Sequence, residues 1–533
     1  MNRSILIRID NSEESGLGHI SRSAEIGRIL KLHDYQVFYA LDRQWPKEFN
    51  SGSPNIGELL VLTASPKSHE KETIARFIKQ YGIENLLVDS YKITEDWCKP
   101  FQKMGVRIFA IEDSSVSLQF LENVIPYGIR YLGTRQFPNL GEGSKAISNV
   151  IITAGVGELD IESIPGNSKR VFVYLGSNPS QQIFDQVLEG LLRCTRDSEM
   201  GLQLIFLRSN NISEDLVHSL ISDSPISNRI KVTFVDFTPN IEGLIANCDL
   251  VIGAANTSIY YSSAGLIPQI TFPLNSSQQN DDFQLEQLGH FFNLESIGDF
   301  QDTYFPSFFN SSLVNLPIYK SLLRAAGARP AMNGAQRIVD SIDAVISNRN
   351  SFHLPHTLTE VSEDVRGSAH AFRLRAATDS DVNIIYEGRN LDATRNFMIN
   401  QKRISKPEHY AWWFDNAREN YVGELGETAS IYIWHQIREF EGTKFLIGGW
   451  TPLCSDLHLS VALEALRWQI KATSEQFPRV KWLAAVHKKN SATRFLVNRI
   501  GFKECDRNSF SYQAAEAIIL GGDGDDDFVL YSS

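Results

Sequence analysis

SILIRIDNSEESGLGHISR, residues 4–22, is the stretch that decides the fold of the first part of the chain. Its opening run, 4–9, is largely apolar and is closed by Asp10, as in a buried strand. Glycines at 16 and 18 then permit a tight turn, and a helical stretch follows from Ile20 to Leu32. A strand, a glycine-containing loop and a helix in this order predict the first unit of a parallel α/β sheet.

Strand and helix patterns go on alternating downstream and predict two doubly wound domains in succession. The further strand candidates are Val37–Ala40, Asn85–Val88 and Arg107–Ile111, then Arg170–Leu175, Leu202–Phe206, Ile230–Phe234, Leu250–Gly253 and Gln269–Phe272. We expect Rossmann-type domains at 1–165 and 166–348, facing each other across a cleft. Because ligands of open α/β sheets bind beyond the carboxyl ends of the strands, the cleft is the expected site.

The remainder of the chain predicts a third domain. Residues 349–370 are polar, lack hydrophobic periodicity and are expected to be a linker. A further domain is expected at 371–513, and the resemblance of this part of the chain to a known family implies the α+β class. The last segment, 514–533, contains GGDGDDD at 521–527, and we expect it to be a solvated acidic tail.

Composition excludes several classes of function. The 533 residues carry a net charge of −12, so the protein is a poor general binder of nucleic acid, which requires clustered Lys and Arg. No signal peptide and no run near the roughly 20 apolar residues of a membrane span is recognisable, so we expect no membrane partner and a cytoplasmic location. The five cysteines form no CxxC pair, which fits a reducing compartment and predicts no metal site.

His19 is the residue of this segment best suited to proton transfer. It lies at the start of the first helix, where free N–H groups favour an anion and disfavour imidazolium. A neutral ring can take a proton from a reacting group. Asp10 is close in sequence and is expected to orient either His19 or a bound sugar. The alternative is that His19 only caps or packs the helix.

The segment resembles the N-terminal motif of bacterial UDP-2,4-diacetamido-2,4,6-trideoxy-β-L-altropyranose hydrolases of pseudaminic acid biosynthesis. That family's pattern is R-x-D, a short loop and G-x-G-H-x-x-R. The matching residues are Arg8, Asp10, Gly16, Gly18, His19 and Arg22. Val88-Asp89-Ser90-Tyr91 with Trp97 resembles the family's V-D-x-Y segment and its following tryptophan, and RIFAIED at 107–113 resembles a strand that ends in acidic residues.

The resemblance covers about the first 345 residues and implies a GT-B-like pair of lobes. It implies attack of water on the anomeric carbon with UDP as leaving group, without a cofactor or metal. By this resemblance His19 is the catalytic candidate, and Asp10 and Tyr91 line the sugar side. Gly16, Gly18, Arg22 and Asp89 would contact the substrate, a UDP-sugar. Association with other nonulosonic acid enzymes is a further expectation.

Two rival readings stay open. One is a glycosyltransferase of the same two-lobed fold, in which a sugar acceptor replaces water. The other is a non-catalytic protein that binds sugar nucleotides or serves as a scaffold. Fold alone does not choose among these functions.

The second lobe carries two loops suited to a diphosphate. Gly176-Ser177-Asn178 follows a strand and resembles the family's G-S-D turn, in which backbone N–H groups form an anion nest. The segment Gly253–Ser258, with Asn256, leads into a helix and resembles the family's G-x-G-G-S-T-S loop, matching it at Gly253, Thr257 and Ser258. The alternative is an ordinary strand-to-helix turn. The chain departs from the family next, because Ile259-Tyr260 stands where the family has Trp-Glu, and Ser277-Gln278 where it has Asn-Gln. Loss of the ribose-binding carboxylate is expected to weaken nucleotide binding.

The third domain resembles GNAT-family N-acetyltransferases of the subgroup that acts on amino-sugar nucleotides. The matching segments are 372–381, HYAWWF at 409–414, and the closing stretches 490–496 and 500–502. Asn490 is the candidate contact to acetyl-CoA. The stretch Thr451–Leu463 lacks the glycines and arginine of the family's pyrophosphate loop, so weak or absent acetyl-CoA binding is expected. The domain is either a working acetyltransferase with an altered loop or a domain kept for packing or partner binding.

Overall fold

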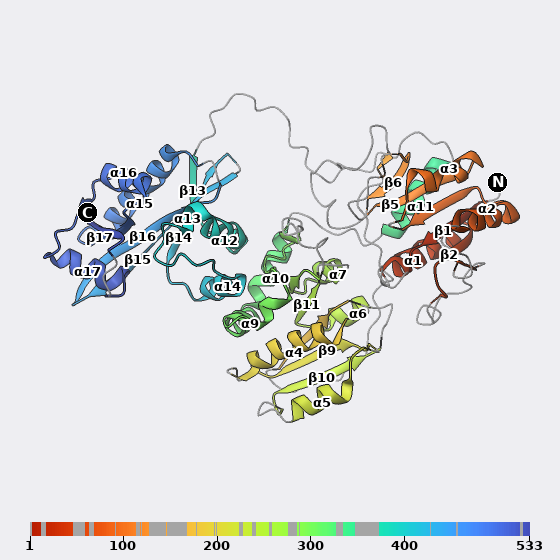
Figure 1. Cartoon of the computed structure of the whole chain (residues 1–533), viewed down its shortest axis with the longest axis horizontal. Coiled ribbons are helices and arrows are strands. Elements are labelled where there is room, and N and C mark those ends of the chain that lie inside the picture. Colours follow the sequence, from red (N-terminus) through yellow and green to blue (C-terminus); the bar gives the residue numbers. More distant parts are fainter. Residues whose placement is uncertain are drawn as a thin grey trace. The chain divides into compact units, whose positions relative to one another are not determined.

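The computed structural model describes most of residues 3–346 and 372–533 (Figure 1). The segments outside the description are 1–2, 12–17, 46–58, 63–68, 91, 113–117, 119, 127–144, 147–167, 177–178, 197, 199, 210, 223–226, 237–240, 255–257, 275–284, 287, 327–333, 347–371, 427, 455–456 and 523–525. The chain divides into two compact units, Met1–Glu360 and Val361–Ser533, and each is described by itself. The expected linker, 349–370, lies outside the described residues.

The first sheet is entirely parallel. Its elements are β1 (Ser4–Ile9), α1 (Gly18–Leu32), β2 (Gln36–Leu41), β3 (Leu59–Val61), α2 (Glu70–Tyr81), β4 (Asn85–Asp89), α3 (Glu95–Lys103), β5 (Arg107–Glu112), β6 (Asn123–Pro126) and β7 (Lys145–Ala146). The seven strands lie in the order β3-β2-β1-β4-β5-β6-β7. The central strands β1 and β4 therefore have their carboxyl ends side by side, with Ile9 next to Asp89.

Helices cover both faces of this sheet. Successive side chains of a strand point to opposite faces, so β1 contributes apolar residues to the core on each side. Ile5 and Ile7 of β1 pack in a cluster with residues of α1 and of α11 (Gly334–Ile346). Leu6 packs in the opposite cluster with residues of α2 and α3. Helix α11, the last of the first unit, thus belongs by packing to the first sheet, beside α1 (Figure 1). The range 166–348, expected as a separate domain, therefore returns to the first sheet at its end.

A carboxylate fixes α11 to the first sheet. Asp343 accepts a hydrogen bond from the Tyr35 hydroxyl at 2.6 Å and lies 2.9 Å from the His33 ring. Arg3 adds an ion pair to the same carboxylate at 3.1 Å. These contacts join sequence positions more than 300 residues apart. One of the helices that cover the first sheet therefore follows the second sheet in the chain.

The second sheet is parallel as well, in the order β10-β9-β8-β11-β12. Its elements are β8 (Lys169–Tyr174), α4 (Gln181–Arg196), β9 (Leu202–Leu207), α5 (Glu214–Ser222), β10 (Ile230–Val235), α6 (Ile241–Ala246), β11 (Leu250–Ala254), α7 (Ser258–Gly265) and β12 (Gln269–Phe272). Phe184 of α4 packs on Phe206 at 4.8 Å between ring centroids, while Leu244 of α6 joins the cluster around Ile205. The expected pair of doubly wound sheets is confirmed.

Shorter helical elements follow β12. They are η6 (Ile297–Gln301), α9 (Phe305–Val314) and α10 (Leu316–Ala325). Phe300, Phe305, Phe308 and Phe309 are fully buried in them. Phe300 packs edge-on against Phe272 of β12 at 5.3 Å, so this aromatic layer closes one side of the second sheet.

The C-terminal unit has a mixed sheet, which confirms the expected α+β class. Its elements are β13 (Phe372–Ala376), η7 (Asp379–Asp381), α12 (Val382–Asn390), α13 (Asp392–Arg395), α14 (Lys406–Asp415), β14 (Glu419–Leu425), β15 (Thr428–Phe440), β16 (Thr443–Pro452), α15 (Leu459–Gln476), β17 (Lys481–His487), α16 (Ser491–Arg499), β18 (Lys503–Glu504), α17 (Phe510–Ile519) and β19 (Phe528–Ser532). The strand order is β13-β14-β15-β16-β17-β19-β18. All neighbours pair antiparallel except β16 and β17, which pair in parallel.

Strands β16 and β17 part after a short contact. Their pairing ends at Ile447 and Leu483, after which β16 continues along β15 and β17 along β19. Gly448 stands at the point of divergence, where an added Cβ would lie 2.4 Å from the Trp434 carbonyl and 2.7 Å from the Trp482 ring. Glycine fits there because the backbone carbonyl of residue 434 and the ring of Trp482 fill the space that a side chain would need.

The expectation of a solvated tail at 514–533 is wrong. Residues 510–519 form α17, and β19 inserts between β17 and β18. Val529, Leu530 and Tyr531 are buried, and Tyr531 packs with Trp482 and other core residues. The acidic run misled the prediction because the apolar FVLY that follows it in the chain belongs to β19 and supplies core residues.

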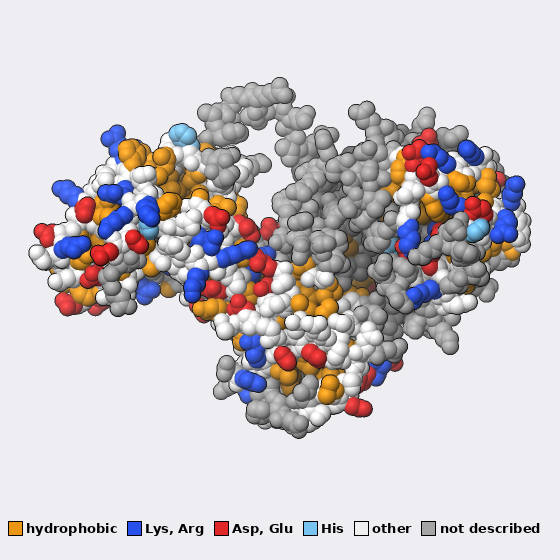
Figure 2. Space-filling model, viewed as in Figure 1, with side chains coloured by type: hydrophobic (Ala, Val, Ile, Leu, Met, Phe, Trp, Pro, Cys, Tyr) orange, Lys and Arg blue, Asp and Glu red, His pale blue; other side chains and the backbone are white. Residues whose placement is uncertain are grey.

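Surface charge is mixed on the face shown in Figure 2, where basic and acidic side chains of the described residues are interspersed. Within the described ranges, no helix combines the length and the apolar character that crossing a bilayer requires.

Removing β19 should unfold the C-terminal unit. Tyr531→Ala leaves a cavity beside Trp482 and should lower the free energy of unfolding by about 3–5 kcal/mol, as for large aromatic truncations. Asp526→Ala, in the same terminal segment but with a 97% exposed side chain, should leave the melting temperature unchanged. Thermal unfolding followed by circular dichroism measures both. Equal melting temperatures for the two variants would show that the terminal segment is not part of the core.

Candidate active site

Asp89 is the hub of the site at the edge of the first sheet. It is the last residue of β4 and is fully buried. Its carboxylate accepts hydrogen bonds from Arg22 Nε at 2.7 Å and Ser23 Oγ at 3.0 Å, and also from Arg22 Nη2. The ring of His19 places Nδ1 2.8 Å from Asp89 Oδ1. One carboxylate therefore ties three residues from the start of α1 to the central strands.

The charge on Asp89 determines which nitrogen of the His19 ring carries the hydrogen. Burial by itself would raise the pKa of Asp89, but the charges and hydrogen bonds of Arg22 and His19 hold that pKa well below its ordinary value. An ionised carboxylate can only accept, so Nδ1 of His19 must carry the hydrogen. In the neutral ring Nε2 is then the atom that can take a proton.

The surroundings of His19 differ from the expectation in two respects. We expected the ring to face an open cleft, but its side chain is only 4% exposed. The carboxylate that orients it is Asp89, whereas Asp10 forms an ion pair with Lys92. Asp89 and Arg22, expected as substrate contacts, are buried and bonded to each other instead.

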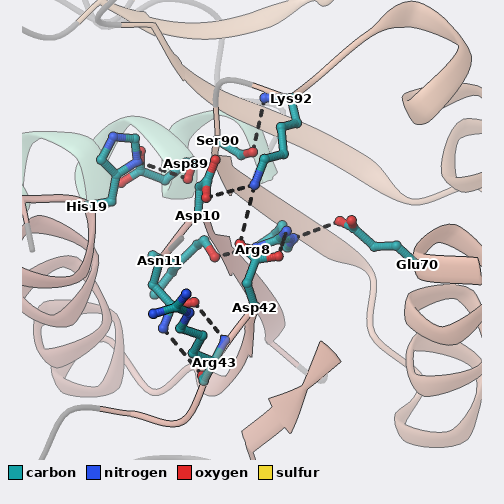
Figure 3. A network of polar contacts seen from close by, with 11 residues as sticks. Arg8, Asp10, Asn11, His19, Asp42, Arg43, Glu70, Asp89, Ser90 and Lys92 are labelled. Atoms are coloured by element: carbon teal, nitrogen blue, oxygen red, sulfur yellow. Dashed lines mark hydrogen bonds and ion pairs between the residues drawn. The ribbon is translucent and has the colours of Figure 1, made fainter. Parts of the chain in front are cut away.

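A second polar network lies next to this pair, at the carboxyl ends of β1 and β2 (Figure 3). Arg8 is buried and donates from Nη2 to Asp42 at 2.7 Å and from Nε to Glu70 at 2.9 Å. Burial alone would lower the pKa of Arg8, but the two carboxylates raise it above its ordinary value. Arg8 thus joins β1 to the loop after β2 and to the first turn of α2.

Lys92 completes this network from the segment after β4. Its Nζ lies 3.0 Å from Asp10 Oδ1 and 3.7 Å from Asp42 Oδ2 (Figure 3). Its side chain is 46% exposed, so the cation borders the surface while Asp10 is buried. The sequence analysis missed Asp42, Glu70 and Lys92 because none of them lies in a recognised motif. They come together only because the strand order places the ends of β1, β2 and β4 side by side.

Several expected site residues cannot be placed. Gly16, Tyr91, Ser177, Asn178, Asn256, Thr257 and Gln278 lie outside the described residues. Gly18 is the first residue of α1, and Gly176 has φ 90°, a left-handed conformation that favours glycine at this turn.

The start of α7 in the second sheet is held by an internal polar network. Ser258, expected to contact the nucleotide, is buried and accepts from Gln269 Nε2 at 3.1 Å. Gln269 in turn accepts from Ser262 Oγ at 2.8 Å. Ser263 Oγ lies 2.8 Å from Nε2 of the buried His290. These hydroxyls therefore connect α7 to β12 and to the segment that follows it.

A cavity of about 1100 Å³ lies in the C-terminal unit where β16 and β17 part. Gly448, Gly449, Ala484 and Ala485 of the diverging strands are among its lining residues. Asn490 lines it too, and its Oδ1 accepts from the backbone N–H of Thr493 at 2.9 Å, capping α16. The volume suits a small-molecule ligand.

No group of three or more His, Cys, Asp or Glu side chains suited to a metal ion occurs among the residues that the structure describes.

Comparison with known proteins gives likenesses to solved structures alone. No family model and no curated protein matches the chain. MurG of Acinetobacter baumannii is 13% identical with a TM-score of 0.46, covering 64% of this chain and 99% of its own. The S. aureus MnaA–UDP co-structure is 10% identical with a TM-score of 0.45, covering 65% and 97%. A putative UDP-N-acetylglucosamine 2-epimerase from Listeria monocytogenes is 9% identical, with a TM-score of 0.44 and coverage of 65% and 97%. With TM-scores below 0.5, these likenesses carry no argument about activity.

Asp89→Ala should strongly destabilise the first unit. It leaves the buried Arg22 without its carboxylate, and breaking one side of a buried ion pair costs about 3–5 kcal/mol. Asp96→Ala, which breaks the exposed pair with Lys99, is the matched control and should leave urea unfolding unchanged. A midpoint for Asp89→Ala equal to that of the control would mean that the hub does not form in solution.

Acid should destabilise the second sheet through His290. Burial lowers the pKa of His290 to about 4, from an ordinary value of 6.5. A lowered pKa means that stability is fully present above pH 6.5 and is lost as the pH falls from 6.5 toward 4, by about 3 kcal/mol at most. The difference in unfolding free energy between wild type and His290→Asn should shrink over this window. A difference independent of pH would contradict a buried neutral ring.

Proposed function

We propose that the first unit hydrolyses a UDP-activated 2,4-diacetamido-trideoxy sugar to the free sugar and UDP. The observation that carries the proposal is the contact of His19 Nδ1 with Asp89 at 2.8 Å, at the start of the helix that follows β1. A histidine whose ring is held by an ionised carboxylate is oriented for general base work. The nature of the sugar rests on the sequence resemblance.

In the proposed reaction the oxygen of water forms a bond to the anomeric carbon. The bond from that carbon to the β-phosphate oxygen breaks, and its electron pair leaves with UDP. Nε2 of His19 takes the proton of the attacking water. Asp89 stays ionised, holds the ring and stabilises the imidazolium that forms, since Arg22 and Ser23 keep its other oxygen bonded.

Two features near the pair could favour an anionic group, although Lys92 is also paired with Asp10 and Asp42. The N–H groups at the start of α1 and the half-exposed Lys92 are the groups of this edge that would favour a diphosphate. Because only 4% of the His19 side chain is exposed, the reaction requires water or the sugar to reach Nε2 from the side opposite Asp89.

For the C-terminal unit, the cavity between β16 and β17 favours ligand binding over a role in packing alone. Acetyl transfer to an amino sugar, with Asn490 near acetyl-CoA, is a proposal carried by the sequence resemblance.

His19→Ala should lower the rate of UDP release from the UDP-sugar by about a hundredfold or more, as for loss of a general base. His69→Ala, which removes an exposed histidine just before α2, should leave the rate unchanged. A coupled assay for free UDP on a panel of sugar nucleotides measures both variants. Near-normal turnover by His19→Ala would remove His19 from the mechanism.

Product analysis separates the rivals. Free sugar formed without an acceptor identifies a hydrolase, whereas UDP release only in the presence of a sugar acceptor identifies a glycosyltransferase. Absence of UDP release from every sugar nucleotide, together with measurable binding, identifies a non-catalytic binder.

A further inference from the structure

One wall of the cavity in the C-terminal unit combines tryptophans with arginines. Arg389, His409, Trp412, Arg418 and Trp434 all line it, and we refer to them as the tryptophan–arginine wall. His409 lies 5.4 Å from the ring of Trp412, and Trp412 lies 5.2 Å from the Arg418 guanidinium. The wall is therefore continuous along this part of the cavity.

Arg418 has no carboxylate partner within the part of the chain that the structure describes. Its guanidinium lies 3.7 Å from the ring centroid of Trp434. Burial lowers its pKa, yet an arginine keeps its charge at neutral pH. Stacking leaves the N–H groups at the edge of the guanidinium in plane and able to meet a ligand.

Arg389, on α12, has an N–H group that none of the described residues accepts. Its Nη2 donates to the Asn400 carbonyl at 2.7 Å, but its Nη1 is buried and has no hydrogen-bond partner. Glu408 attracts it through space, and no described carboxylate forms an ion pair with it. A buried donor without an acceptor is unfavourable unless a ligand supplies one.

Thr394 gives an independent sign of a ligand. It lines the same cavity, is 8% exposed, and its Oγ1 has no hydrogen-bond partner. Buried hydroxyls are nearly always bonded, so an unbonded one in a cavity wall marks a place for a polar ligand atom.

We propose that the tryptophan–arginine wall binds a small organic anion, a carboxylate or phosphate ester that carries an apolar ring. Arg389 and Arg418 donate to the anion, Thr394 donates a further hydrogen bond, and the indole rings cover the ring of the ligand. Burial lowers the pKa of His409 to about 4, so its ring is neutral at neutral pH and adds no charge to the wall. The inference does not depend on the activity proposed for the first unit.

Calorimetric titration of the full chain with phenyl phosphate and with benzoate tests the site. Both anions should bind, more weakly as salt is raised. Arg418→Gln and Arg389→Gln should each weaken the binding by about tenfold, the loss expected for a hydrogen bond to a charged group. Arg467→Gln, which removes an exposed arginine of α15 outside the cavity lining, should change nothing.

Thr394→Val keeps the shape of the side chain and should weaken binding by about threefold to tenfold. Circular dichroism and melting curves establish that each variant is folded, and if Arg418→Gln is not, Arg389→Gln and Thr394→Val decide. The ratio of the two anion affinities tells a phosphate site from a carboxylate site. Equal binding of neutral benzyl alcohol, undiminished binding by the folded variants, or no binding of either anion would overturn the proposal.

Discussion

The buried carboxylate of Asp89 is the interaction on which the first unit depends. Burial by itself disfavours its charge, and the bonds from Arg22, Ser23 and His19 compensate. Because Asp89 ends a central strand and its partners all lie near the start of α1, the carboxylate fixes the first helix relative to the sheet. The same contact orients the ring of His19, so stability and the proposed chemistry share one group.

The contact with Asp89 that orients His19 also buries its ring. A ring packed against a carboxylate in the interior is well oriented, but it is also 4% exposed. The neighbouring network of Arg8, Asp42, Glu70, Lys92 and Asp10 is built differently, since one of its cations, Lys92, reaches the surface. The two networks meet where the backbone N–H of Asp10 donates to the Asp89 carbonyl, which links the buried His19–Asp89 pair to the partly exposed Lys92.

The C-terminal unit shows the same tension between packing and binding. At Gly448, where β16 and β17 part, the Trp434 carbonyl and the Trp482 ring leave no room for a side chain, and the cavity begins at the same place. Strand β19, from the last residues of the chain, pairs along the other edge of β17, from Leu483 to His487. The terminal segment therefore holds β17 in the sheet beyond the point where its pairing with β16 ends.

The sequence by itself determined the two parallel sheets, because alternating apolar runs and glycine turns are local signals. The mixed class of the third domain and the proposed role of His19 rest on family resemblances. The sequence did not determine that Asp89 rather than Asp10 would hold His19, that Lys92 would pair with Asp10, or that the acidic end would precede a core strand. Those contacts join residues as far apart as 82 positions, and the strand order β2-β1-β4 brings them together. Only the packed sheet decides which side chains meet at its edge, since burial and pairing are properties of neighbours in space.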